Sequence, residues 1–246
     1  VSKGDQGSPP RDEKRRNAGF YPVATVSHGR VSNIFHFSYA GYFWLHTFRS
    51  GSSWKTEAIG RWGDGMSLFG QQGNDGRTHF AFRQLRFNAD PSPSLYSVWP
   101  IEPPIREVID PSASVLSFEL TPDETAVAVL RRPGPAGTNT LHLARRVAAQ
   151  WQYELLPEYL GQVFGDFAIG PDGQMFFVTW NTETRELLLH RRHADRWLTE
   201  IVATRLETEP SKFVLRIDSH GRPVVIVGRL NAGRGDWLRV YRQQPK

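Results

Sequence analysis

The chain has 246 residues and a formal net charge of +5; 39% of its residues are hydrophobic and none is cysteine. The missing cysteines exclude a disulfide scaffold, a thiol nucleophile and thiolate metal sites. No apolar run approaches the roughly 20 residues needed to cross a bilayer, so no membrane span is expected.

The chain starts with a polar segment and continues as groups of short strands. Residues 1–19 lack apolar periodicity and are predicted to be a polar N-terminal tail or a closing arm. Runs rich in strand-forming residues follow, separated by tight turns. Strands are predicted at 21–26, 31–39, 42–49, 54–59, 78–83, 115–120, 126–130, 141–145, 151–156, 164–169, 175–180, 187–190, 197–202, 213–218, 224–229 and 238–242. The last group lacks a fourth strand.

Two independent features recur along the chain at one period. The third residue of a tight turn lies at positions 29, 76, 124, 173 and 221, in steps of 47 to 49 residues. The pattern Trp-x-x-Glu-x-apolar begins at Trp54, Trp151 and Trp197, with a degenerate copy at Pro104. Four-stranded units of roughly 40 to 50 residues are typical of β-propeller blades.

We therefore predict an all-β fold, a five-bladed β-propeller built from four-stranded repeats of about 48 residues. Residues 20–246 are expected to form a single propeller domain, with blades at about 20–60, 61–110, 111–160, 161–209 and 210–246. The recurring Trp is expected to be an apolar wedge between adjacent blades. The Glu three residues later is expected to face solvent or to bond to a neighbouring strand.

The turns Thr121-Pro122-Asp123-Glu124 and Gly170-Pro171-Asp172-Gly173 resemble the Ser-Pro-Asp-Gly turn of bacterial TolB-like propellers. That resemblance implies a turn linking the first and second strands of a blade. Five copies of about 48 residues also resemble the architecture of tachylectin-type five-bladed lectins, which implies a lectin-like, carbohydrate-binding protein.

Arginine accounts for 25 of the 30 basic residues. This bias is compatible with a polyanion partner or with codon usage, but the arginines are scattered along every repeat. Scattered charge is typical of a solvated surface, so a nucleic-acid partner is not expected.

No catalytic residue, metal site or cofactor is assigned from the sequence. Asn74 and Asp75 alone do not supply the oxygen ligands of a calcium loop. His190 and His193 point to opposite faces of a strand. Phosphate-binding and dinucleotide-binding fingerprints are missing. The candidate acids are Asp166, Glu119 and Asp218 on first strands, and Asp64 just before one; these are either ordinary strand-end acids or an acid–base pair of a glycoside hydrolase.

The ligand site is expected in loops that connect one blade to the next. Two of them place an aromatic ring beside charged groups: Trp62 with Arg61 and Asp64, and Tyr159 with Glu158. A ring that stacks on a sugar, flanked by hydrogen-bonding charges, is a physical basis for glycan binding. The alternative interpretation is that Trp62 and Tyr159 cap the scaffold.

The resulting functional hypothesis is a non-enzymatic binding module that holds a glycan or protein ligand on one face of the propeller. The alternatives are a glycoside hydrolase with carboxylates at the channel mouth and a spacer domain of a larger envelope protein. The compartment is unknown from the sequence, with a secreted or cell-envelope location favoured.

Overall fold

The computed structural model describes residues 20–27, 30–38, 43–61, 68–83, 94–99, 105–134, 138–157, 162–204, 210–229 and 237–243. All regular secondary structure in these residues is strand. The strands are β1 (Phe20–Ser27), β2 (Arg30–Ser38), β3 (Phe43–Ser50), β4 (Ser53–Arg61), β5 (Leu68–Gln72), β6 (Thr78–Arg83), β7 (Ser94–Trp99), β8 (Ile105–Asp110), β9 (Ser114–Leu120), β10 (Ala126–Pro133), β11 (Asn139–Val147), β12 (Gln150–Leu155), β13 (Gln162–Ile169), β14 (Met175–Asn181), β15 (Glu186–His193), β16 (Arg196–Ala203), β17 (Lys212–Ile217), β18 (Pro223–Arg229) and β19 (Trp237–Arg242).

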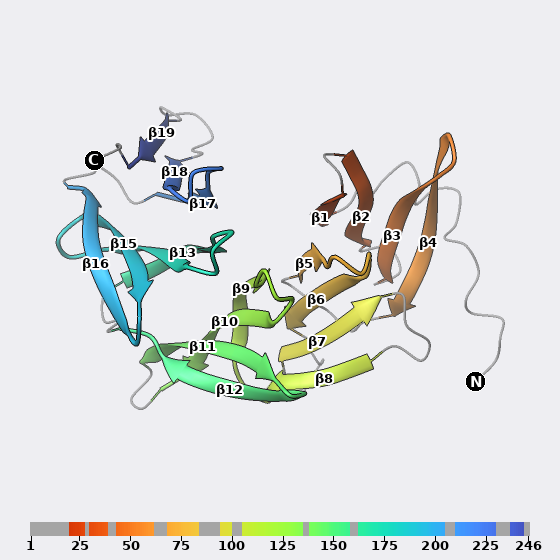
Figure 1. The fold of residues 1–246 in the computed structure, drawn as a ribbon, viewed down its shortest axis with the longest axis horizontal. Coiled ribbons are helices and arrows are strands. Elements are labelled where there is room, and N and C mark those ends of the chain that lie inside the picture. Colours follow the sequence, from red (N-terminus) through yellow and green to blue (C-terminus); the bar gives the residue numbers. More distant parts are fainter. Residues whose placement is uncertain are drawn as a thin grey trace. The chain divides into compact units, whose positions relative to one another are not determined.

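The strands form five antiparallel sheets in which neighbours pair in chain order (Figure 1). Strands β1–β4, β5–β8, β9–β12 and β13–β16 make four-stranded sheets, and β17–β19 make a three-stranded one. These sheets are the blades of a five-bladed β-propeller, so the predicted all-β fold class is confirmed. The chain divides into two compact units, residues 1–115 and 116–246.

The recurring tight turn joins the first and second strands of a sheet. Its third position is glycine at Gly76, Gly173 and Gly221, with φ of 78°, 79° and 74°. The Gly173 N–H donates to the Gly170 carbonyl at 2.9 Å. In the third sheet Glu124 takes this position with φ of 63°. Left-handed backbone favours glycine, which explains why this residue type marks the repeat.

Strand β14 explains the core of the 116–246 unit, because both of its faces are buried. Phe176, Val178 and Trp180 pack with residues of β17 and β18 in one cluster. Met175 and Phe177 face the other way and pack with residues of β10 and β11 in a second cluster. Alternate side chains of a strand point to opposite faces. The continuous apolar run is therefore that of a strand between two neighbouring sheets.

Aromatic contacts also join sheets in the 1–115 unit. Phe35 of β2 meets Phe80 of β6 edge to face, with ring centroids 4.4 Å apart. Phe35 stacks on His46 of β3 at 4.6 Å, and Phe177 stacks in the same way on His190 of β15 at 4.1 Å. The histidines thus serve the packing of their own sheets.

The repeated Trp and Glu form a contact between the third and fourth sheets. The ring of Trp197 packs edge to face on Phe177 at 4.9 Å, and its Nε1 donates to Glu154 Oε1 at 3.1 Å. Arg192 also donates to Glu154. The predicted wedge is confirmed for Trp197. Trp54 differs, since 48% of its surface is exposed.

The fifth sheet ends at β19, and no fourth strand pairs with it among the described residues. The sequence predicted that the last sheet lacks a fourth strand, and the described residues agree with this prediction. The N-terminal residues 1–19 lie outside the described residues, so their role as a tail or closing arm stays a prediction.

Candidate functional site

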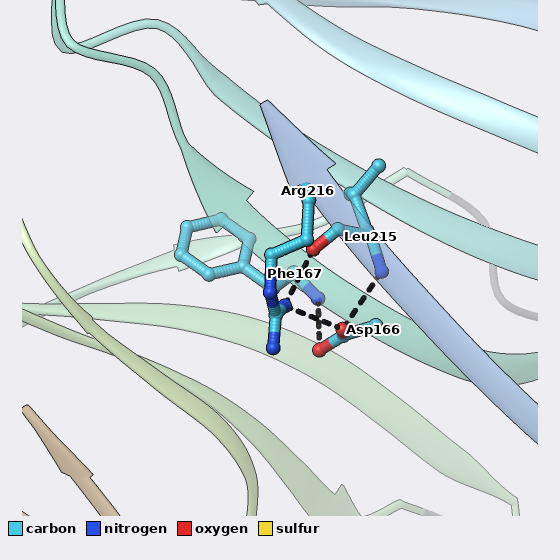
Figure 2. A network of polar contacts seen from close by, with 4 residues as sticks. All are labelled: Asp166, Phe167, Leu215 and Arg216. Carbon is cyan, nitrogen blue, oxygen red and sulfur yellow. Dashed lines mark hydrogen bonds and ion pairs between the residues drawn. The ribbon is translucent and has the colours of Figure 1, made fainter. Parts of the chain in front are cut away.

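Three polar side chains come from the first strands of the third, fourth and fifth sheets. Glu119 lies on β9, Asp166 on β13 and Arg216 on β17, all in the 116–246 unit. Figure 2 shows Asp166 with its neighbours on β13 and β17. We call Glu119, Asp166 and Arg216 the first-strand cluster.

A bulge at Gly165 aims Asp166 at the next sheet. Phe164 pairs with Thr179 and Asp166 with Val178, so Gly165 is an extra residue in β13. A Cβ at Gly165 would lie 2.7 Å from Cγ of Phe213 on β17. Only glycine therefore allows β13 and β17 to approach this closely. Bulges commonly redirect a side chain in this manner.

The Asp166 carboxylate bridges two strands of different sheets (Figure 2). Its Oδ1 accepts the Phe167 N–H at 2.9 Å, and its Oδ2 accepts the Leu215 N–H at 2.9 Å. Nη1 of Arg216 lies 3.4 Å from the same Oδ2 and donates to the Leu215 carbonyl at 2.6 Å. Asp166 therefore satisfies a main-chain donor on the first strand of the fifth sheet, which has no strand partner on that side among the described residues.

Burial raises the pKa of both Glu119 and Asp166, but hydrogen bonds and a nearby charge oppose the shift at Asp166. Desolvation, and secondarily the charge of Asp166, raises the pKa of Glu119 to about 8, although Arg216 opposes the shift. Burial also raises the pKa of Asp166, but the hydrogen bonds from Leu215 and Phe167 and the Arg216 charge counteract it. Burial therefore keeps Glu119 protonated near neutral pH, whereas the donors around Asp166 favour its ionised form.

A neutral carboxylic acid near an ionised one is an arrangement that general acid–base chemistry can use. Asp166, however, already accepts bonds on both oxygens. The Arg216 side chain is 66% exposed, so the first-strand cluster presents a positive charge to solvent. The cluster can therefore donate a proton from Glu119 or contact an anionic or hydroxylated ligand through Arg216.

The acids named from the sequence separate into two groups. Glu119 and Asp166 interact electrostatically. Asp218 instead belongs to a turn, where it accepts the N–H groups of His220 and Arg222 at 2.9 and 3.0 Å. Hydrogen bonds from Arg222 lower the pKa of Asp218 to about 2. Asp218 is thus the ordinary turn acid that one interpretation of the sequence expected.

Sequence reasoning did not single out Arg216. A signal was available, since Glu119 and Arg216 each lie five positions before the third residue of their turn, Glu124 or Gly221. Aligning the repeats on the turn therefore places both residues at the same level of their first strands.

The predicted ligand site is not described in atomic detail. Arg61 is the last residue of β4, but its side chain lies outside the described residues. The residues Trp62, Asp64, Glu158 and Tyr159 also lie outside them. The strand bounds do place these positions between β4 and β5 and between β12 and β13. All five assignments therefore stay predictions.

A further loop between two sheets, Asp110-Pro111-Ser112, which connects β8 to β9, is described. Asp110 is 3% exposed, and its Oδ1 accepts the N–H groups of Ser112 and Ala113 at 2.8 and 2.7 Å. The Ser94 hydroxyl donates to the Ala113 carbonyl. These bonds hold the loop on its own sheet, which is a structural role.

Among the residues that the structure describes, no group of three or more His, Cys, Asp or Glu side chains is arranged to hold a metal ion. In that part of the chain no helix has the length and apolar character that crossing a bilayer would require.

No protein-family model matches the sequence. No curated protein matches it either. Among solved structures, the chain is similar to a protein of unknown function from Dyadobacter fermentans DSM 18053, with 11% identity, coverage of 91% of this chain and 79% of that chain, and a TM-score of 0.61. It is also similar to TolB from Acinetobacter baumannii, with 13% identity, coverage of 91% and 53%, and a TM-score of 0.59.

The chain spans about half the length of that TolB chain. Identities this low show the fold alone. At the level of fold, the resemblance to TolB-like propellers that the turns predicted is confirmed.

Proposed function

We propose that this propeller is a non-enzymatic binding module that takes a glycan or protein ligand on one face. The observation that carries the proposal is that the Asp166 carboxylate accepts hydrogen bonds from the main chain. Both of its oxygens accept main-chain N–H groups, one from its own strand and one from the next sheet. An acid engaged in this way holds strands together and has little capacity left for chemistry on a substrate.

Ligand contact is assigned to the loops between blades. Rigid sheets that display variable loops are a common way to present binding residues. Arg61, Trp62 and Asp64 follow or end β4, and Glu158 and Tyr159 follow β12. In this proposal Trp62 and Tyr159 stack on a sugar ring or an apolar side chain, and the neighbouring charges donate or accept hydrogen bonds.

The test is a glycan array with the full chain, followed by titration calorimetry of each glycan that binds. Trp62→Ala and Tyr159→Ala are expected to weaken binding at least tenfold without lowering the melting temperature. Trp54→Ala is the matched control, because Trp54 is 48% exposed and lies at the opposite end of β4 from Arg61. Unchanged affinity in both loop variants would remove these loops from the site.

A second candidate, a glycoside hydrolase, is favoured by one observation. Burial gives Glu119 a pKa of about 8, which keeps it protonated as a general acid must be. Aryl glycosides of common sugars test this candidate. Hydrolysis by the wild type that falls at least a hundredfold in Glu119→Gln, with the fold retained, would establish the hydrolase and overturn the binding-module proposal.

A further inference from the structure

The outer edge of β19 is an open sheet edge in the described part of the chain. Gln243 N–H donates to the Pro223 carbonyl of β18 at 3.5 Å. Bonds to one neighbour alternate along an antiparallel strand, so the N–H groups of Val240 and Arg242 point to the other edge. Beside them, Leu238 and Val240 are 71% and 58% exposed. An edge with free donors and apolar side chains is a template for another strand.

The four-stranded sheets show which kind of strand pairs with the outer edge of a third strand. In the second, third and fourth sheets the third strand pairs with a strand that carries the repeated Glu. The register pairs are Tyr96 with Glu107, Leu143 with Glu154 and Leu189 with Glu200. When the sheets are aligned on their turns, the third-strand residue that faces the Glu corresponds to Val240 in the fifth sheet. Val240 pairs with Ile226 of the second strand, just as Leu189 pairs with Val178. The edge of β19 therefore matches the edges that accept a Glu-bearing strand.

Glu200 supplies a second part of the site. In the preceding pair of sheets, Glu154 accepts the indole N–H of Trp197 from the next sheet at 3.1 Å. Glu200 occupies the position of Glu154 in the fourth sheet and is exposed. Within the described residues, no hydrogen bond or ion pair involves the side-chain carboxylate of Glu200. An indole on a fourth strand of the fifth sheet would meet this carboxylate as Trp197 meets Glu154.

Charge and sequence indicate which strand fits. Arg242 is exposed and shares a face with Val240, so a Glu opposite Val240 has Arg242 as its diagonal neighbour. The strand β19 carries Arg239 and Arg242 and no acidic residue, so pairing two copies edge to edge would add only positive charges to the new sheet, which disfavours self-association. Trp-x-x-Glu-x followed by Ile, Leu or Val occurs in the sequence only at Trp54, Trp151 and Trp197, in β4, β12 and β16.

We propose that the β19 edge, together with Glu200, is a docking site for an extended segment of a partner protein with the pattern Trp-x-x-Glu-x-apolar. The segment adds as a fourth strand, its main chain bonds to Val240 and Arg242, and its indole donates to Glu200. Strand addition of this kind combines main-chain affinity with side-chain specificity. The site is separate from the loops assigned above and goes beyond the ligand binding proposed for them.

The probe is a fluorescent peptide with the sequence of β16, Arg196–Ala203, titrated into the full 246-residue protein by anisotropy. Saturable binding is expected, with none for a scrambled peptide. A Trp→Phe peptide and the protein variant Glu200→Gln are each expected to weaken binding about threefold to tenfold, as loss of one hydrogen bond implies. Combining the two changes should add no further loss, because they remove the same bond.

Edge variants complete the test. Val240→Pro removes an outward N–H and is expected to abolish binding. Leu155→Pro is the matched control, since Leu155 is 62% exposed on the outer strand of a complete sheet. If Val240→Pro does not fold, Val240→Lys and Glu200→Gln still decide the matter. Lack of peptide binding, or equal loss in Leu155→Pro, would overturn the proposal. So would binding only after deletion of residues 1–16, because that segment would then be the occupant.

Discussion

The indole Nε1 of Trp197 donates to Oε1 of Glu154, 43 residues earlier in the chain, at a distance of 3.1 Å. Both residues belong to the repeated Trp-x-x-Glu pattern, yet the bonded pair comes from two different repeats. In this pair the pattern makes a contact between neighbouring sheets, in which the Glu of the third sheet accepts a hydrogen bond from the Trp of the fourth.

Trp197→Phe is expected to lower the free energy of unfolding by about 1 kcal/mol, because the ring packing on Phe177 stays and the hydrogen bond to Glu154 is lost. Urea unfolding of the variant measures the change. Trp54→Phe is the control, since Trp54 is half exposed. Equal losses in the two variants would contradict a specific role for the Trp197–Glu154 bond.

Gly165→Ala is expected to destabilise the protein by about 1–3 kcal/mol, because the new methyl group would overlap with Phe213 and Val178. The relevant contacts of a Cβ are 2.7 Å to Phe213 and 2.9 Å to Val178. Denaturant melts measure the effect. Phe213→Leu in the same chain should recover part of the loss, and strictly additive losses would show that the overlap is not the cause.

Glu119 is expected to make the protein less stable as the pH rises from about 4.5 to 8. Its pKa is raised to about 8 in the folded state. The folded protein therefore binds more protons than the unfolded chain in this range, so stability falls with increasing pH.

Glu119→Gln should remove this dependence and exceed the wild type in unfolding free energy at pH 8 by on the order of 4 kcal/mol. At pH 5 the two proteins should be nearly equal. Guanidinium melts across the range measure the difference, with the exposed Glu183→Gln as control. A difference that does not grow with pH would show that Glu119 ionises normally.

His190 is expected to act in the opposite direction. It is 3% exposed, bonds to Thr179 and Thr199 at 2.8 and 2.9 Å, and burial lowers its pKa to about 4. The unfolded chain then binds the proton more readily, so stability is lost as the pH falls from about 6.5 to 4.

His190→Gln should reduce this acid sensitivity by on the order of 2 kcal/mol between those pH values. The measurement is the change in urea midpoint with pH. His220→Gln, in an exposed turn, should keep the wild-type slope. An unchanged slope in His190→Gln would mean that other groups, such as His36 and His46, carry the acid response.

The local structure of this protein could be predicted from the sequence because its determinants are local. A positive φ at Gly173 and at Gly221 favours a residue without a Cβ, and glycine marks most of the described turns. The apolar run at 175–180 has strand-forming residues on both faces, which predicts a strand between two sheets. From these signals the strands, the period and the five-bladed class followed.

The candidate site could be predicted only in part. Glu119 and Asp166 were named as acids on first strands together with Asp218, and the hydrogen bonds of the structure show that Asp218 serves a turn. The assignments of Trp62 and Tyr159 rest on composition and loop position, and they stay predictions.

By itself, the sequence determined the repeat, its turns and the class of fold, because turn chemistry and strand periodicity act between residues close in the chain. The tertiary structure decided which side chains meet across sheets. Asp166 reaches Leu215, 49 residues away, only because the bulge at Gly165 turns it toward a neighbouring sheet that approaches closely. The burial that raises the pKa of Glu119 likewise depends on how sheets pack, and residues close in sequence do not encode that packing.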